Sequence, residues 1–568
     1  MDLFLDIETN TSHDHIWMCY TFDEENGYLC HNEPETLIPL INKADKVIGH
    51  NLIGFDGPIL NRLWGTKISL KKSLDTLVMS RLARPDILGG HSLEAWGERL
   101  GKKKIDYQRV YWRLSGVRKF DKKDLSHFNS PHLPLMHKYC KRDVEVLVLV
   151  YNKLRAELKG WGESVALEHR IANILKEQER YGFKFDHVSA SGLLARLQGE
   201  LADIEGALQE SFPPYTVQRF SEKTGKELKP KEVVFNPGSR QQIAERLQAL
   251  GVKFDRKTEK GQTIIDEKVL AGINIPEARL INRYLLVQKR ISQVSSWFDE
   301  VKDDGRIHGY VNTIGAVTGR MTHSSPNMAQ IPNSGSEYGP ECRACFTVAD
   351  GYSLVGADAS GLELRMLAHY MGDVGYVKTV VEGSSKDGTD VHTINQKAAG
   401  LSTRDQAKTF IYAFLYGAGP TKIGSIVGGD ARVGSQLMQK FLRATPALQM
   451  LRETVAEQAA KGYVPGLDGR KVWVRSEHAA LNTLLQSAGA IVMKKALILL
   501  DKKLKDGIID AHFVANVHDE WQIEVKQGFE EQVGVMAVES IEEAGRYFGL
   551  NCPLTGEWGT GKTWKDTH

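Results

Sequence analysis

Two aspartates, far apart in the chain, lie where apolar strands are predicted to end. Asp358 follows the apolar segment 352–355 and precedes a helical pattern. Asp519 lies with His518 and Glu520 between two alternating segments, and this pattern predicts the tip of a β-hairpin. Carboxylates at strand ends bind hard cations such as Mg²⁺, although Asp358 alone could equally cap the following helix. Together, the two aspartates could share a pair of divalent ions of the kind used in phosphoryl transfer.

Between these aspartates, cations and aromatic residues repeat every four positions. Arg404, Lys408, Tyr412 and Tyr416 would share one face of an α-helix. Two cations suit a triphosphate, and the two rings beyond them suit a stacked base and sugar. Taken alone, the same spacing also fits a surface helix with a solvated basic edge.

A second group of acids is spread over the N-terminal quarter of the chain. Asp6 and Glu8 are two apart on a predicted strand and so face the same way. Two carboxylates at the end of a buried strand are costly unless they bind metal. Asp56 stands at the start of a predicted helix, while Tyr139 and Asp143 are four apart on one face of another.

The elements that must position these residues belong to a chain of 568 residues, which is long enough for several domains. We expect a boundary near 159–162, a helix over 167–181, and a second helix that begins with a capping box at 239–242. Lysine plus arginine (73) nearly balance aspartate plus glutamate (71), so net charge neither favours nor opposes nucleic acid. The six cysteines are scattered, which is typical of a reducing compartment. We find no signal peptide, and no run approaches the ~20 apolar residues of a membrane span.

These segments resemble known motifs. Asp-Ala-Ser-Gly-Leu-Glu-Leu-Arg at 358–365, Thr-Arg-Asp-Gln-Ala-Lys-Thr-Phe-Ile-Tyr at 403–412 and His-Asp-Glu at 518–520 resemble motifs A, B and C of family A (polymerase I-like) DNA polymerases. The amino-acid sequences of these motifs are most similar to those of replicative polymerases of short-tailed bacteriophages. The N-terminal acids resemble the Exo I, II and III motifs of DnaQ-like 3′–5′ exonucleases.

The resemblance implies an α/β and α+β fold class, with an N-terminal RNase H-like exonuclease domain followed by a right-hand polymerase domain. We expect the exonuclease domain at 1–160 and the polymerase domain at 161–568. The expected subdomains are the thumb at about 163–305, the palm at about 306–375 and 500–568, and the fingers at about 376–499.

For the polymerase, the resemblance implies that Asp358 and Asp519 bind two Mg²⁺ ions, with Mn²⁺ as a substitute, and that Glu520 supports the site. Glu363 would block a 2′-hydroxyl and so select deoxynucleotides, while Tyr412 implies acceptance of dideoxynucleotides. The implied nucleotide-binding residues are His392, Arg404, Lys408, Tyr412 and Glu363. The implied DNA contacts are Arg320, Tyr416, Arg475, Asn482, Gln486 and His518.

For the exonuclease, the resemblance implies two-metal hydrolysis of the primer 3′ end. Asp6, Glu8, Asp56 and Asp143 would hold the ions, and Tyr139 would orient the attacking water. Because all four carboxylates are present, we expect an active proofreading nuclease. A further acid, Asp75, is expected to support the structure.

The expected partners are primer–template DNA, deoxynucleoside triphosphates and a replisome helicase and primase. The related phage enzymes carry a large thumb insertion that binds host thioredoxin, whereas the corresponding stretch 212–236 is short and holds a Ser-Glu-Lys-Thr-Gly turn. We therefore expect no thioredoxin clamp. The implied setting is phage genome replication by a monomer in the cytoplasm of an infected bacterium, without membrane attachment.

Two other functions compete with this interpretation. A single-subunit RNA polymerase shares relatives of these motifs, but Glu363 and the exonuclease acids argue against it. A catalytically silent DNA-binding protein would not need intact carboxylates at both sites. The segment 556–563 matches the phosphate-loop pattern G-x-x-x-x-G-K-[ST], but only five residues follow it, so no useful helix can form.

Overall fold

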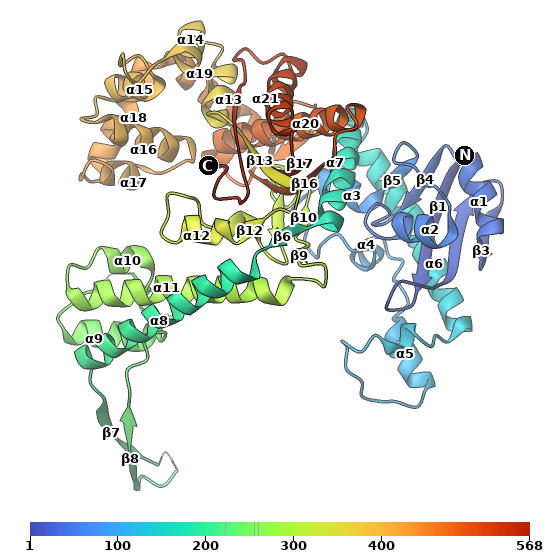
Figure 1. Cartoon of the computed structure of the whole chain (residues 1–568), viewed down its shortest axis with the longest axis horizontal. Helices are drawn as coiled ribbons and strands as arrows, with labels where there is room; N and C mark the ends of the chain where they lie inside the picture. Colours follow the sequence, from blue (N-terminus) through green and yellow to red (C-terminus); the bar gives the residue numbers. More distant parts are fainter. Residues whose placement is uncertain (222, 255, 259–260) are drawn as a thin grey trace.

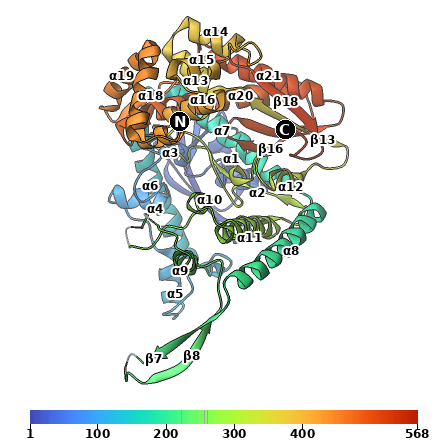
Figure 2. The same ribbon diagram turned by 90° about the vertical axis from the view of Figure 1, so that its left-hand side faces the viewer.

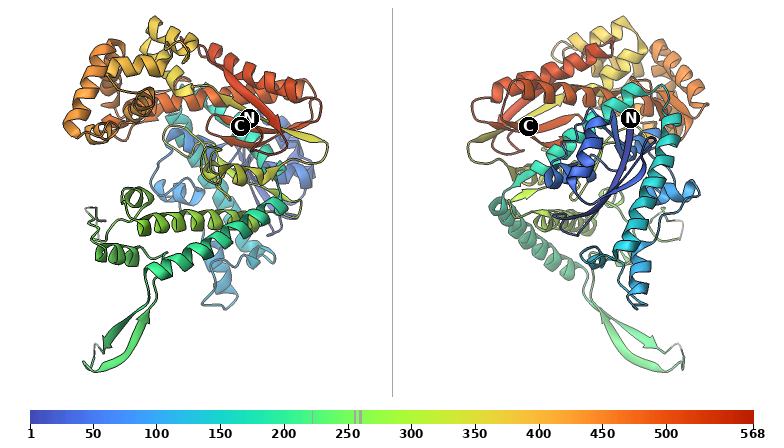
Figure 3. Two further views of the ribbon diagram at one scale, coloured as in Figure 1. Left: turned by 60° about the vertical axis from the view of Figure 1, so that its left-hand side comes forward. Right: turned by 90° about the vertical axis from the view of Figure 1, so that its right-hand side faces the viewer.

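The computed structural model describes residues 1–221, 223–254, 256–258 and 261–568. Figure 1 shows an N-terminal sheet on one side, a second sheet surrounded by helices above, and a long pair of helices with a projecting hairpin below. Figures 2 and 3 show the same arrangement from other sides.

The N-terminal region is a sheet with helices on both faces. Its elements are β1 (Asp2–Thr9), β2 (Ile16–Asp23), β3 (Gly27–His31), α1 (Pro34–Lys43), β4 (Lys46–Gly49), α2 (Asp56–Trp64), β5 (Ser73–Asp75), α3 (Thr76–Ala83), α4 (Leu93–Arg99), α5 (Tyr107–Leu114), a 3₁₀ helix (Ser126–Phe128) and α6 (Leu133–Glu157). The strand order is β3-β2-β1-β4-β5, with β4 and β5 parallel and β2 antiparallel to their neighbours.

The side chains of the central strand β1 point alternately into two hydrophobic cores. Leu3, Leu5 and Ile7 pack with residues of α1 and α2, whereas Phe4 packs with residues of α3 and α6. Successive side chains on a strand point to opposite faces, so the acids at positions 6 and 8 face the same way as Phe4, toward α6.

A single helix, α7 (Gly162–Tyr181), follows this region and links it to the rest of the chain. It packs against α3 on one side and against α20 (Ala480–Asp506) and β16 (Ala511–Val517) on the other. It begins five residues before the predicted start and ends, as predicted, before Gly182, whose φ of 71° lies in the left-handed region.

The second sheet is antiparallel, with the order β16-β17-β13-β18. Its further elements are β13 (Tyr352–Ala359), α13 (Leu362–Met371), β17 (Glu520–Lys526), α21 (Glu530–Tyr547) and β18 (Gly556–Gly561). Helix α21 packs on β13 and β18 and against α20. The phosphate-loop pattern falls largely on β18 and forms a strand, so it is not a phosphate loop.

Helix α20 is the core helix of this region. Residues 477–506 are long and apolar enough to cross a membrane by length and composition, but 72% of the most apolar window is buried inside the protein. Ile491, Leu497 and Leu500 belong to one apolar core with Trp521 and Ile523 of β17. The apolar character of α20 is therefore explained by packing within the fold.

A cluster of helices extends from this sheet (Figure 1). It comprises α14 (Val374–Glu382), α15 (Val391–Ala399), α16 (Arg404–Leu415), α17 (Pro420–Ser425), α18 (Ala431–Ala444) and α19 (Pro446–Ala459), then the hairpin β14 (Tyr463–Pro465) and β15 (Lys471–Trp473) and a 3₁₀ helix (Glu477–Ala479). Phe410, Phe414 and Phe441 hold α16 and α18 together, with ring centroids 5.1–5.9 Å apart.

The lower region is built on two long helices that pack along each other, α8 (His187–Ser211) and α11 (Pro276–Glu300). It also contains β6 (Phe183–Phe185), β7 (Tyr215–Phe220), β8 (Glu227–Val233), α9 (Arg240–Ala249), α10 (Glu267–Ala271), β9 (Arg306–Ile307), β10 (Tyr310–Asn312), β11 (Thr322–Ser324), a 3₁₀ helix (Met328–Gln330), α12 (Gly339–Ala344) and β12 (Phe346–Thr347). Ser239 caps α9 as predicted, but the Gln242 side chain accepts from Asn236 N, so the capping box is incomplete.

Strands β7 and β8 form a hairpin that projects into solvent (Figure 2). Its described residues are exposed, apart from half-buried Ser221 and Val233. At its base, the rings of Phe212 and Phe235 lie 4.7 Å apart and are buried in the core of the lower region. Residue 222, in the predicted turn, lies outside the described residues.

Because the hairpin packs on itself, we expect it to be dispensable for stability. Replacing residues 216–232 with a short Gly-Ser link should change the Tm by less than about 2 °C, since exposed substitutions have small effects. Differential scanning calorimetry measures this change. The matched control is Phe235→Ala, which removes a buried ring and should lower the Tm clearly; a large loss on hairpin deletion would contradict the prediction.

Candidate active sites

The two strand-end aspartates of the second sheet lie side by side. In the antiparallel register of β13 and β17, Asp358 is the partner of Glu520. The backbone N–H of Ala359 donates to the carbonyl oxygen of Asp519 at 3.2 Å. His518 and Asp519 form the turn between β16 and β17, as predicted, and His518 has a left-handed φ of 59°. Strand pairing therefore fixes both carboxylates at one edge of the sheet.

Within the described ranges, Asp358 and Asp519 form no salt bridge with a basic side chain. Partial burial, followed by repulsion from Asp519 and Glu520, raises the pKa of Asp358 to about 7. Burial also raises the pKa of Asp519. A divalent cation would relieve this repulsion, and an exposed aspartate beside a half-buried one offers the oxygen ligands that Mg²⁺ prefers.

Glu520 differs from its two acidic neighbours because its Oε1 already has hydrogen-bonding partners within the protein. Oε1 accepts hydrogen bonds from Gln522 Nε2 at 2.7 Å and Trp564 Nε1 at 2.6 Å, and lies 2.9 Å from His568 Nε2. Burial alone would raise the pKa of Glu520, but the contacts with His568 and Gln522 bring it below its ordinary value. These contacts suit a supporting role. Sequence spacing did not indicate the role of Trp564 and His568, since they lie 44 and 48 positions away.

One face of α16 carries the predicted series of cations and aromatic rings. Arg404 and Tyr412 are half-buried, while Lys408 and Tyr416 are exposed. The ring centroids of Tyr412 and Tyr416 are 6.4 Å apart. Thr403 and Gln406 form a complete capping box at the start of this helix. The series therefore lies on an accessible face, as the spacing predicted.

His392, on α15, lies beside this face. Its ring centroid is 6.2 Å from that of Tyr412, and Arg404 is tied to the neighbouring helix by a 3.0 Å contact with Asp390. His392 Nδ1 is buried and has no hydrogen-bond partner among the described residues. Burial, followed by the charge of Arg404, lowers the pKa of His392.

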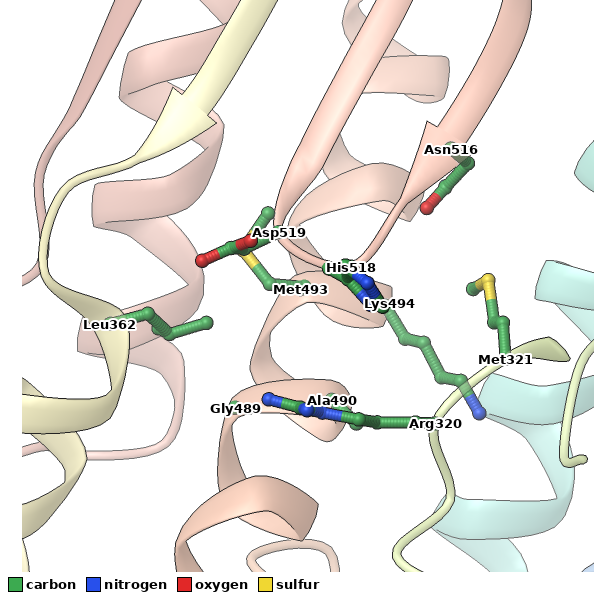
Figure 4. A pocket seen from close by; sticks show the side chains of 10 residues that line it. All are labelled: Arg320, Met321, Leu362, Gly489, Ala490, Met493, Lys494, Asn516, His518 and Asp519. Carbon is green, nitrogen blue, oxygen red and sulfur yellow. The ribbon is translucent and has the colours of Figure 1, made fainter. Parts of the chain in front are cut away.

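Glu363 at the start of α13 is held by two neighbours. Its carboxylate accepts from the Tyr416 hydroxyl at 2.7 and 2.8 Å and from Arg320 Nη2 at 3.1 Å. Arg320 lines a small pocket together with His518 and Asp519 (Figure 4). The structure thus brings three segments far apart in sequence to the carboxylate edge.

The other predicted DNA contacts lie around α20. Asn482 and Gln486 are half-buried on a helix that is otherwise mostly buried, and they share one face. Arg475 is exposed in the segment before the helix. Gly489 and Ala490, one turn further on, line the same pocket as Asp519, so this face leads toward the carboxylates (Figure 4).

The N-terminal acids form a second, more deeply buried cluster between β1, α2 and α6. Asp56 Oδ1 accepts from the backbone N–H of Ile7 at 3.2 Å. Asp6, Glu8 and Cys140 present ligand atoms that lie within 4.8 Å of one another. Asp143 is buried, and its Oδ1 has no hydrogen-bond partner among the described residues. The cluster fits a metal centre because it gathers several carboxylates and includes the unpaired Oδ1 of Asp143.

Burial and mutual repulsion raise the pKa values in this cluster. Burial, then the charges of Asp143 and Asp56, raise the pKa of Asp6 well above its ordinary value. Burial also raises the pKa of Glu8, brings that of Asp56 to about 7 and brings that of Asp143 to about 6. Tyr139, half-buried one turn before Asp143, faces the same cluster. Sequence spacing did not indicate Cys140, because its neighbours offer no metal-ligand pattern.

Asp75 has the supporting position expected of it. Its carboxylate accepts from the backbone N–H groups of Asn51 and Ile53, at 2.9 and 3.0 Å, and from Leu77 N at 2.9 Å. Its own backbone N–H donates to His169 Nε2 at 2.8 Å. Asp75 therefore fixes the loop that leads to Asp56.

The two clusters are joined through α7. Glu168, next to His169, is fully buried and accepts from Lys494 Nζ at 2.8 Å and from Arg470 Nη1 at 2.6 Å. Arg470 Nη2 also donates to Asp468 at 2.6 Å. The four charges balance, which allows them to be buried together.

Comparison with known proteins places the chain among polymerases. The profile of DNA polymerase family A matches residues 216–566. The DNA-directed DNA polymerases of Enterobacteria phage T3 and Escherichia phage T7 are each 36% identical, over 93% of this chain and 93% of their own. The thermostable DNA polymerase I of Thermus aquaticus is 26% identical over 71% of this chain and 51% of its own.

A solved structure shows the same fold. The POL domain of Pol1 from M. smegmatis, in complex with DNA primer-template and dNTP, matches 100% of this chain and 96% of its own with a TM-score of 0.79 and 20% identity. The expected fold class, with a right-hand polymerase architecture, is confirmed.

The raised acid pKa values predict how stability depends on pH without metal. An acid whose pKa is raised on folding stabilises the protein at low pH, and this contribution is lost as pH rises through the folded-state value. In EDTA, neutralising Asp56 should therefore reduce the fall in Tm between about pH 5 and about pH 8, because its pKa is about 7. Thermal unfolding of wild type and Asp56→Asn across this range measures the difference. Parallel curves for the two proteins would contradict the assignment.

Proposed function

The chain belongs to DNA polymerase family A and is a DNA-directed DNA polymerase, and from this premise we propose that Asp358 and Asp519 hold the divalent cations of its polymerase site. The supporting observation is the strand register that sets Asp358 opposite Glu520 and beside the hairpin turn. Members of the family are metal-dependent, and we propose Mg²⁺, with Mn²⁺ as a substitute. Bound there, two such ions would activate the primer 3′-hydroxyl and neutralise the leaving pyrophosphate.

We propose that α15 and α16 bind the incoming triphosphate. Arg404 and Lys408 offer fixed positive charge, and His392 offers a ring nitrogen that has no partner among the described residues. Tyr412 continues the same face and would lie against the sugar and base. Its hydroxyl can replace a missing 3′-hydroxyl, which supports acceptance of dideoxynucleotides.

We propose that Glu363 selects deoxynucleotides by occupying the space that a 2′-hydroxyl would need. Its hydrogen bonds from Tyr416 and Arg320 hold the carboxylate in one position, so it cannot turn away easily. Tyr416 would then act partly through Glu363 and partly as a stacking surface for the template.

We propose that primer–template DNA lies across α20 and the carboxylate edge. Asn482 and Gln486 would donate to minor-groove acceptors, which occupy similar positions in every base pair. Arg475 would contact the backbone, and Arg320 and His518 would contact the primer end. The M. smegmatis structure, which contains DNA primer-template and dNTP, supports this choice of partners.

We also propose a 3′–5′ proofreading exonuclease in residues 1–160. Asp6, Glu8, Asp56 and Asp143 would hold two divalent cations, and Tyr139 would orient the attacking water. The supporting observation is the convergence of these carboxylates from β1, α2 and α6 with raised pKa values. The rest of the chain would form the thumb, palm and fingers with the boundaries expected above.

The phage relatives support a role in phage genome replication in the cytoplasm of the host. We propose that the protein acts as a monomer with a replisome helicase and primase. Thioredoxin is not expected as a partner, because residues 215–233 provide only a short hairpin where the related phage enzymes carry an insertion.

The two proposed sites can be separated by mutation. Asp358→Ala should reduce primer extension by at least about 10³-fold and leave 3′ degradation intact, since the site would lose a metal ligand. Asp6→Ala should do the reverse and extend a mismatched primer without trimming it. Gel analysis of a mismatched primer with Mg²⁺ measures both activities, and EDTA is the control. Loss of both activities in either variant would contradict the assignment to separate sites.

The position of Glu363 predicts sugar selectivity. Glu363→Ala should reduce discrimination against ribonucleotides by about 10–100-fold, because the space for a 2′-hydroxyl opens. Tyr416→Phe removes only the hydrogen bond and should have a smaller effect in the same direction. Single-nucleotide incorporation kinetics measure both ratios. Wild-type selectivity in Glu363→Ala would refute the assignment.

A further inference from the structure

A lysine lies inside the N-terminal carboxylate cluster. Lys104 precedes α5, and its ammonium forms an ion pair with Oδ2 of Asp143. The same ammonium lies 5.0 Å from the ring centroid of Tyr139. Lys104 therefore contacts two of the residues proposed for exonuclease chemistry, although it belongs to none of the sequence motifs.

A hydrogen bond and an ion pair hold the segment around Lys104 against α6. Arg142 Nη1 donates to the carbonyl oxygen of Lys103 at 3.1 Å, and Lys102 Nζ lies 2.8 Å from Oε2 of Glu145. Arg142 Nε also donates to Glu145 at 2.9 Å. These contacts fix the segment one residue before Lys104, so its long side chain reaches the cluster from a held position.

The ion pair gives the two oxygens of Asp143 different surroundings. Oδ2 is bound to Lys104, whereas Oδ1 is buried without a hydrogen-bond partner in the described ranges. Oδ1 is therefore the oxygen of Asp143 that is left open to a cation, and such outer contacts orient metal ligands. Within the described part of the chain, Lys104 also supplies the one salt bridge to the four clustered acids.

We propose that Lys104 is a positioning residue of the exonuclease site, which orients Asp143 and Tyr139 and competes with the divalent cations for the charge of the cluster. This inference rests on the proposed exonuclease function. It requires that removing Lys104 change metal affinity and hydrolysis in opposite directions. The ions should bind more tightly once a repelling charge is gone, while the misplaced Asp143 and Tyr139 should slow hydrolysis.

Mn²⁺ binding provides a test that does not depend on activity. All proteins carry Asp358→Asn and Asp519→Asn, so that the polymerase site contributes little to the signal. Lys104→Met should bind Mn²⁺ about tenfold more tightly, because a unit positive charge at ion-pair distance is removed. Electron paramagnetic resonance of free Mn²⁺ measures this affinity. Unchanged or weaker binding would overturn the proposal.

Two matched variants separate charge and position. Lys103→Met removes the same charge from the same segment, but the Lys103 side chain is exposed and only its carbonyl contacts α6, so wild-type behaviour is expected. Lys104→Arg keeps the charge and should keep Mn²⁺ affinity near that of wild type. Tighter binding in Lys103→Met would overturn the proposal, because the effect would then be one of net charge alone.

Degradation of single-stranded DNA from its 3′ end completes the test. With the polymerase site intact, Lys104→Met should degrade DNA at least about tenfold more slowly, while primer extension stays unchanged and shows that the protein is folded. If wild type itself does not degrade DNA, the exonuclease proposal fails. If wild type degrades DNA and Lys104→Met does so equally fast, only the inference on Lys104 fails.

Discussion

Repulsion between carboxylates that are crowded into partly buried positions is the constraint on which this structure depends. It appears at the edge of the second sheet and again beside β1. In both places, regular structure forces the charges together: antiparallel pairing of β13 and β17 at one site, and packing of α6 across β1 at the other. Folding supplies the energy that holds the carboxylates close, and bound cations would lower this cost.

The buried charges around Glu168 behave differently. Two cations and two carboxylates meet there, every charged group has a partner, and the cluster needs no ligand. Burial lowers the pKa of Lys494 to about 8, and the charge of Glu168 opposes this shift. The balanced charges around Glu168 hold the two regions in a fixed geometry. The two carboxylate clusters are not balanced and so remain available for chemistry. This difference separates framework from active site in a chain with nearly equal numbers of acids and bases.

The sequence predicted best what depends on local periodicity. The strand that carries Asp358 near its end, the turn at Asp519 and the face of α16 follow from alternation by two or by four, and the structure has each of them. The family and fold class followed from long, ordered motifs. Features that join distant segments could not be predicted in this way. Examples are the pairing of β18 with β13 and the three contacts that engage Glu520.

Local rules also failed where a competing partner was available. Gln242 was expected to complete a capping box but binds the Asn236 N–H instead, because the preceding turn brings that donor within reach. The stretch 215–233 has a clear turn signal, yet its strands were not predicted, since its residues lack the alternation of a half-buried strand. Solvent on both faces leaves no apolar pattern to detect.

The position of α7 has a practical consequence for anyone who wishes to shorten this protein. Glu168 accepts from Lys494 of α20, while its neighbour His169 accepts from the backbone N–H of Asp75 in the N-terminal region. A fragment that begins after α7 would leave Lys494 buried without Glu168 and Arg470 paired with Asp468 alone. A fragment that begins at α7 would expose the apolar surface that α7 packs against α3. The two regions therefore share one helix, and neither can be excised without exposing buried groups; single substitutions disturb the fold less than truncation does.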